Sequence, residues 1–191
     1  WPEEDISAPN DSAICYRRYQ LGVQPMVELF HRVCQPMATQ QTPGANLFGL
    51  RAVAIDGTVE DVADTDENVR VFGRYSTDEN ASPFPQAKVV YLVECGTHAI
   101  IDAGLWPCRT SERVGGFRML RSIEEGMLVM WDRGLHDYQM IHGVRKRKAH
   151  MLSRLPGSVK PRPIRWLKDR SYIAYLTPKD YTICRFKYTY F

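Results

Sequence analysis

The feature that most constrains the fold is a run of five apolar residues, Met127 to Trp131, which Asp132 and Arg133 follow directly. Every position in the run is apolar, as expected of a strand that is covered on both faces. The run is far shorter than the roughly 20 residues that a membrane-spanning helix needs, and no apolar run in the chain is longer, so we expect no membrane association. It therefore predicts a central strand with a carboxylate at its exit.

Alternating and apolar patterns predict further strands and helices on either side of this run. Two of the strands are separated only by Gly96-Thr97, which indicates a hairpin. The predicted strands are Leu50–Asp56, Lys88–Cys95, His98–Ala103 and Ala149–Ser153, and the predicted helices are Ser111–Ile123 and Asp137–Lys148. An antiparallel meander followed by strand–helix units predicts a mixed α/β fold.

The beginning of the chain differs in character from this sheet region. Residues 1–20 are polar and start without Met, which suggests the severed end of a longer protein. A helix is expected from Gly22 to Ala38, with Pro25 in its first turn. Its apolar side chains recur at helical spacing, and we expect this stripe to pack into a core.

Composition narrows the class of protein. Hydrophobic residues make up 44% of the chain and charged residues 25%, which are values of a globular protein and exclude wholesale disorder. The 5 cysteines are scattered and form no Cys-x-x-Cys pair, so zinc and disulfide frameworks are both disfavoured. A reduced, cytoplasmic compartment fits this usage best.

Charge is distributed very unevenly along the chain. Residues 1–142 carry 12 Lys and Arg against 20 Asp and Glu, whereas residues 143–191 carry 13 against 2. Such a basic segment, interleaved with aromatic residues, favours a nucleic-acid partner, although a solvated helix face followed by a basic linker would look the same. The candidate DNA-binding residues are Arg145, Lys146, Arg147, Lys148, Arg162, Arg165 and Lys168.

Two aspartates occupy positions that suit catalysis. Asp56 ends a predicted strand before Gly57, and Asp132 ends the apolar strand. If these strands are neighbours, the carboxylates converge, and such a pair needs a cation or a proton between its members. Oxygen ligands of this kind prefer Mg²⁺ or Mn²⁺, and two such ions can promote phosphodiester cleavage. The alternative is that both aspartates only begin turns, as Asp before Gly often does.

Three ordered blocks, 48–58, 84–98 and 126–134, closely resemble bacterial insertion-sequence transposases of family four. The resemblance covers roughly residues 21 to 176. It implies a ribonuclease-H-like catalytic core with an Asp-Asp-Glu triad, in which Asp56 is the first acid and Asp132 the second. It further implies two divalent ions, Mg²⁺ or Mn²⁺, cleavage of transposon ends by water, and attack of the freed 3′-hydroxyl on target DNA. Arg133 would face the DNA.

The chain departs from the family pattern after Glu125, because no later glutamate exists to serve as the third acid. In the family that Glu lies on a late helix, preceded by Tyr and Arg and followed by Lys, beyond a β-rich insertion. Residues 171–176 and 181–188 would be the first strands of that insertion. We therefore expect a helical N-terminal remnant at 1–46, a ribonuclease-H-like core at 47–155 that is truncated before its late catalytic helix, and the basic start of the insertion at 156–191.

The resulting prediction is a DNA transposase fragment that acts on double-stranded DNA but is catalytically incomplete by itself. The full-length protein would be nucleoid-associated in a bacterial cytoplasm and could form a homodimer. Two alternatives remain open at this point. One is a DNA-binding remnant without catalysis, and the other is an unrelated metal-dependent nuclease that recruits Asp137 as a third acid.

Overall fold

The computed structural model describes residues 9–77 and 80–177, which fall into two compact units divided between Gln35 and Pro36. The first unit contains α1 (Asp11–Leu21) and α2 (Gln24–Val33). α1 lies in the region expected to be a helical remnant, although its bounds were not predicted. Asn10 caps α1 by accepting a hydrogen bond from the Ala13 amide at 2.7 Å.

Within the described part of the first unit, the apolar stripe on α2 does not pack into a core. No residue of α1 or α2 is buried, and Met26 and Val33 on the predicted stripe are 60% and 64% exposed. Two helices of 11 and 10 residues form no second layer within this unit that could cover the stripe.

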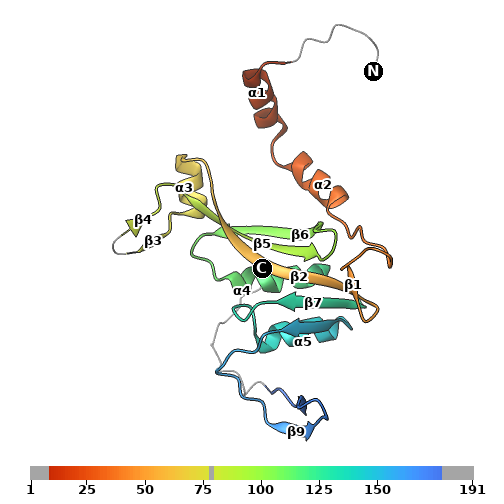
Figure 1. The fold of residues 1–191 in the computed structure, drawn as a ribbon. Coiled ribbons are helices and arrows are strands. Elements are labelled where there is room, and N and C mark those ends of the chain that lie inside the picture. The colour runs from red at the N-terminus through yellow and green to blue at the C-terminus, as the bar shows by residue number, and fades with distance from the viewer. Residues whose placement is uncertain (1–8, 78–79, 178–191) are drawn as a thin grey trace. The chain divides into compact units, whose positions relative to one another are not determined.

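A mixed sheet forms the centre of the second unit (Figure 1). Its strands are β1 (Asn46–Leu47), β2 (Leu50–Asp61), β5 (Gln86–Glu94), β6 (Ile100–Pro107), β7 (Met127–Trp131) and β8 (His150–Ser153). The order is β6-β5-β2-β7-β8, with β1 paired to β2. β5 and β6 pair antiparallel, as the Gly96-Thr97 hairpin predicted, and β2, β7 and β8 run parallel. The predicted mixed α/β layout, an antiparallel meander followed by parallel strand–helix units, is confirmed.

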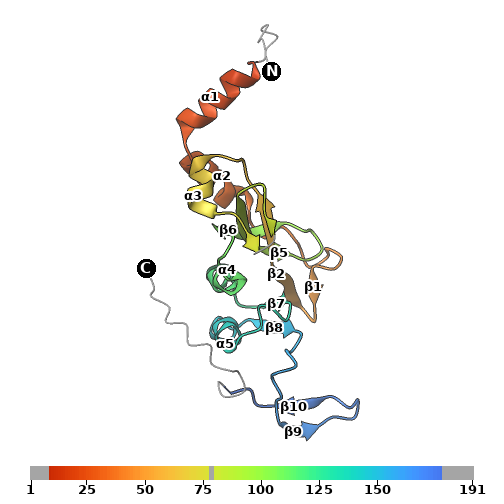
Figure 2. The same ribbon diagram turned by 90° about the vertical axis from the view of Figure 1, so that its left-hand side faces the viewer.

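The predicted central strand is β7, which lies between β2 and β8. α4 (Glu112–Met119), a 3₁₀ helix at Leu120–Ser122 and α5 (Tyr138–Lys146) follow the hairpin and β7. Figure 2 shows α4 and α5 on the same side of the sheet. Their apolar side chains meet those of the strands in one core, whose members include Val53, Ile55, Val90, Leu92, Met119, Leu120, Val129, Trp131, Leu135, Met140 and Val144.

Shorter elements flank the sheet. α3 (Asp66–Phe72) follows β2, and β3 (Ser76–Thr77) pairs with β4 (Asn80–Ala81). Near the end of the described chain, β9 (Pro163–Trp166) pairs antiparallel with β10 (Tyr172–Ala174). β10 lies within the predicted strand at 171–176, whereas β9 was not predicted, and the strand predicted at 181–188 lies outside the described residues. None of the described helices is long and apolar enough to cross a bilayer.

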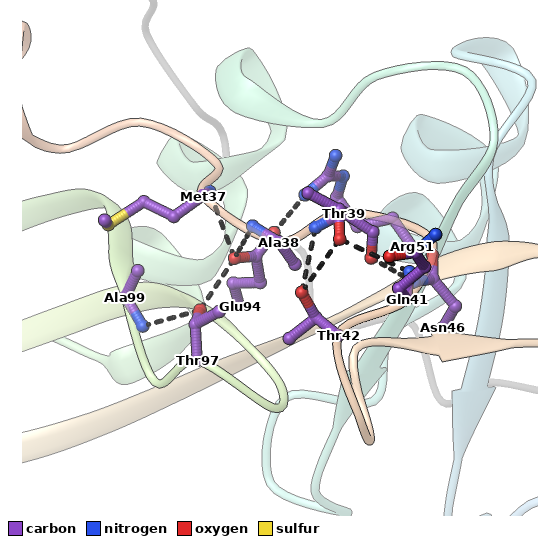
Figure 3. A network of polar contacts seen from close by, with 10 residues as sticks. All are labelled: Met37, Ala38, Thr39, Gln41, Thr42, Asn46, Arg51, Glu94, Thr97 and Ala99. Carbon is purple, nitrogen blue, oxygen red and sulfur yellow. Dashed lines mark hydrogen bonds and ion pairs between the residues drawn. The ribbon is translucent and has the colours of Figure 1, made fainter.

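A buried carboxylate ties the segment before β1 to the sheet (Figure 3). Glu94, at the end of β5, is fully buried, and its Oε2 accepts hydrogen bonds from the amides of Met37 at 3.1 Å and Ala38 at 2.7 Å. The same oxygen accepts from the Thr97 hydroxyl at 2.6 Å, and Oε1 pairs with Arg51. Burial raises the pKa of Glu94, but these donors more than offset it, so the pKa lies below its ordinary value.

Candidate active site

The two aspartates singled out in the sequence lie on adjacent parallel strands, at the point where the pairing of β2 with β7 ends. The expectation that Asp56 ends its strand is wrong, because β2 continues through Gly57 to Asp61, where it still pairs with β5. β2 and β7 pair in register from Arg51–Met127 to Ile55–Trp131, so Asp56 and Asp132 are the next residues on the two strands. Both are exposed. The carboxyl ends of parallel strands open onto the edge of the sheet where α/β proteins bind ligands. The adjacency that the convergence argument required is therefore present.

Backbone amides orient one oxygen of each carboxylate. Oδ1 of Asp56 accepts from the Gly57 amide at 2.9 Å. Oδ1 of Asp132 accepts from the amides of Gly134 at 2.8 Å and Leu135 at 3.2 Å. Oδ2 of each carboxylate has no hydrogen-bond partner among the residues that the structure describes. Each aspartate thus presents a free oxygen, while backbone amides fix the other one.

The turn after Asp132 is held by groups from α4 and β8. Arg113 Nε donates to the Gly134 carbonyl at 3.2 Å, and Arg113 Nη1 lies 4.0 Å from a carboxylate oxygen of Asp137. The buried His136 places Nδ1 2.7 Å from the hydroxyl of Ser153, at the end of β8. Burial lowers the pKa of His136, Asp137 opposes this effect, and Arg113 adds to it, with a net lowering. A turn that is anchored on both sides keeps Asp132 in place.

Asp137, the alternative third acid, is engaged in the local structure. Its side chain caps α5 by accepting from the Gln139 amide at 2.7 Å, and it faces Arg113 as described above. A cap and a guanidinium partner account for this residue without a metal. The structure therefore gives no support to the alternative in which Asp137 completes a nuclease site.

A different acid, Glu112, was missed by the sequence reasoning. It is the first residue of α4 and is half-buried. Burial raises the pKa of Glu112, and the charges of Asp132 and Asp56 raise it further, whereas Lys88 and the Gly57 amide lower it, with a net increase. The helix predicted at Ser111–Ile123 placed this glutamate in its first turn, and no sequence signal linked it to the two aspartates.

The donor chemistry at this edge fits a hard divalent cation. Carboxylate oxygens are the preferred ligands of Mg²⁺ and Mn²⁺, and both aspartates offer one. Among the described residues no three His, Cys, Asp or Glu side chains are arranged to hold a metal together. The pair therefore fits a cation that takes its remaining ligands from water or substrate oxygens.

The basic residues fall into three separate places. Arg133 is exposed beside Asp132. Arg145, Lys146 and Lys148 are exposed at the other end of α5, whose 9 residues span about 13.5 Å at about 1.5 Å per residue. Arg147 is half-buried and donates to the Gly143 carbonyl at 3.0 Å. The remaining three, all exposed, lie in or beside the β9–β10 hairpin and are Arg162, Arg165 and Lys168. The structure thus brings only Arg133 next to the carboxylates.

Two hollows adjoin the basic end of α5. The first, of about 520 Å³, is lined by Arg145, Lys148, Ala149, His150 and Met151. The second, of about 550 Å³, lies between α5 and the end of the described chain, where its lining includes Tyr138, His142, Arg145, Lys146 and Tyr175. The rings of Tyr138 and His142 are stacked, with centroids 6.4 Å apart. Cationic and aromatic side chains thus gather on this surface, which suits an anionic, ring-bearing ligand.

Comparison with known proteins confirms the resemblance to insertion-sequence transposases. The chain is 26% identical over 131 residues to transposase InsG of insertion sequence element IS4 from Escherichia coli K12. It is 27% identical over 123 residues to the putative transposase InsZ from the same strain. These matches cover 69% and 64% of this chain but only 29% and 41% of the two relatives. No protein-family model matches the chain.

Among solved structures, the chain is similar to a piggyBac transposase in a synaptic complex with hairpin DNA, determined by cryo-electron microscopy. The sequence identity is 13% and the TM-score is 0.46, over 77% of this chain and 30% of that one.

Proposed function

We propose that this chain carries part of the catalytic site of a DNA transposase, in which Asp56 and Asp132 hold a divalent cation against a DNA phosphodiester. The observation that carries the proposal is the pair of oriented carboxylates on adjacent parallel strands, at the point where the pairing of β2 with β7 ends, each with a free Oδ2. The likeness to insertion-sequence transposases supports the choice of DNA as substrate.

In this proposal the chain's own residues do three things. The two aspartates would hold the cation, and the amides of Gly57, Gly134 and Leu135 hold their carboxylates in position. Arg133, exposed beside Asp132, neutralises a neighbouring DNA phosphate. A bound Mg²⁺ or Mn²⁺ supplies activation of the attacking water or 3′-hydroxyl and stabilisation of the leaving oxygen. Cleavage of transposon ends and strand transfer to target DNA follow from that chemistry.

We further propose that the chain by itself is a poor catalyst. Two carboxylates are few ligands for the two ions that phosphodiester cleavage commonly uses, and the chain has no glutamate after Glu125. DNA binding needs only cations near phosphates, which the exposed Arg145, Lys146 and Lys148 provide.

The test is a titration of labelled double-stranded DNA at two salt concentrations, followed by a nicking assay with Mg²⁺ and with Mn²⁺. We expect binding that weakens steeply with salt, because each phosphate contact releases counterions. Replacing Arg145 and Lys146 together by Ala should flatten the dependence of log K on log[salt] by about 1–2. Little nicking is expected. Strong nicking that Asp56→Ala abolishes would show that another acid completes the site and would contradict the proposed incompleteness.

A second candidate function is DNA binding without catalysis. The basic end of α5 favours it, because this surface lies away from the Asp56–Asp132 edge and needs no metal. DNA affinity that is unchanged by chelation and by Asp56→Ala, together with no nicking under any metal, would support this function over the first.

A further inference from the structure

Glu112 approaches the Asp56–Asp132 site from the helix-covered side of the sheet. Its carboxylate lies directly over Gly57, the residue that follows Asp56. A Cβ atom at Gly57 would lie 2.4 Å from Oε1 of Glu112, 2.8 Å from its Cδ and 2.9 Å from its Cγ. Any other residue at this position would therefore displace the glutamate. The Glu112 carboxylate occupies the space that a side chain at position 57 would fill.

The first turn of α4 contacts the chain after both aspartates. Glu112 covers Gly57 on the β2 side, and the next residue, Arg113, donates to the Gly134 carbonyl on the β7 side. The glutamate is thus held in a fixed place beside the two aspartates. Lys88, the nearby cation, is itself engaged through a 2.8 Å hydrogen bond from Nζ to the Thr110 carbonyl.

We propose that Glu112 is a further functional residue of this site, whose negative charge increases the affinity of the Asp56–Asp132 pair for a divalent cation. The inference rests on the proposed function. Successive strand residues point to opposite faces, so Asp56 projects from the face opposite Gly57. Glu112 therefore acts through space, as a positioning charge, and the ligands of the cation remain the two aspartates.

The size of the effect follows from electrostatics. One unit charge several ångströms from a divalent ion, in surroundings as wet as this exposed edge, changes the affinity about fivefold. The effect of a charge held outside the coordination sphere should shrink as added salt screens it. A change in the shape of the site would not shrink in this way.

The experiment measures Mn²⁺ binding to the full chain by calorimetric titration at low and high salt. We expect Glu112→Gln to weaken binding about fivefold at low salt and by less at high salt. Glu112→Asp keeps the charge and should stay within about twofold of the parent. The matched control is Glu67→Gln, which removes an exposed glutamate from the first turn of α3 and should leave Mn²⁺ affinity unchanged.

Gly57→Ala tests whether Glu112 needs the space above Gly57 to act on the site. The added methyl group displaces the Glu112 carboxylate, so this variant should also weaken Mn²⁺ binding. Its effect should largely vanish when Glu112 is already Gln, because the two changes act through one interaction. Full additivity of the two changes would overturn the proposal, as would an Asp variant that loses as much affinity as the Gln variant. Circular dichroism checks that each variant is folded. If Gly57→Ala does not fold, the two Glu112 variants by themselves test the proposal.

Asp56→Asn and Asp132→Asn separate the two proposals. If neither changes Mn²⁺ affinity, the proposed metal site fails and the role of Glu112 fails with it. If both weaken Mn²⁺ binding while Glu112→Gln does not, only the role of Glu112 is wrong.

Discussion

Glu94 offers a prediction whose size can be worked out atom by atom. Its Oε2 serves three donors, the amides of Met37 and Ala38 and the Thr97 hydroxyl, and its Oε1 serves Arg51. A hydrogen bond to a charged group contributes about 1.5–3 kcal/mol, and a buried donor left without a partner costs about 1–3 kcal/mol. Because these terms overlap and Arg51 is partly exposed, we expect Glu94→Ala to lower the free energy of unfolding by about 4 kcal/mol.

Glu94→Gln should cost about half as much. The glutamine oxygen can take the place of Oε2 and keep its three donors. Its amide nitrogen then faces Arg51, where two donors meet and the ion pair is lost. We therefore expect the free energy of unfolding to fall by about 2 kcal/mol, nearly all of it because the interaction with Arg51 is lost.

The assay is urea denaturation of the parent and both variants, with midpoint and slope measured together. Glu125→Ala is the matched control, since this glutamate is 69% exposed in its pair with Lys148 and should change stability by less than about 0.5 kcal/mol. The assignment of this carboxylate as the anchor of the segment before β1 would be refuted if Glu94→Ala and Glu94→Gln lowered the free energy of unfolding equally. A loss below about 1 kcal/mol for Glu94→Ala would refute it as well.

Two further predictions concern the core and its pH dependence. Gly115→Ala should destabilise the fold by about 1–3 kcal/mol in thermal or urea unfolding, because its Cβ would lie 2.4 Å from Cγ2 of Val90, whereas Gly116→Ala meets its nearest neighbour at 3.1 Å and should cost less. Burial raises the pKa of Asp102, but hydrogen bonds from Arg121 and Ser122 lower it by more, so the net shift is downward. The stability from this group is present above the carboxyl's ordinary pKa and lost as pH falls through its lowered value. Arg121→Ala should therefore flatten the acid limb of the stability–pH curve, and an unchanged limb would contradict this assignment.

Local patterns in the sequence were sufficient for most elements of the sheet. The all-apolar run forms β7, and the segments on either side of Gly96-Thr97 form β5 and β6. These elements could be predicted because burial on both faces and tight turns each restrict which residues a segment can contain. The same reasoning placed Asp132 correctly at the end of β7, whereas Asp56 lies within β2, which continues to Asp61 because β5 still pairs with it there. The two aspartates become neighbours if their strands pair in parallel, and the order of strands and helices favoured that pairing.

Long-range contacts were decided by the tertiary structure. Glu94 and Met37 lie 57 residues apart, and nothing in either local sequence reveals that a buried carboxylate caps distant amides. The predicted helix places Glu112 in its first turn, but no local pattern shows that its carboxylate lies against Gly57. The apolar stripe on α2 shows the same limit in reverse, because helical spacing fixes which side chains share a face but not whether another layer covers them. Sequence periodicity reports the local geometry of the chain, whereas burial and electrostatic neighbours depend on packing between segments that are far apart along it.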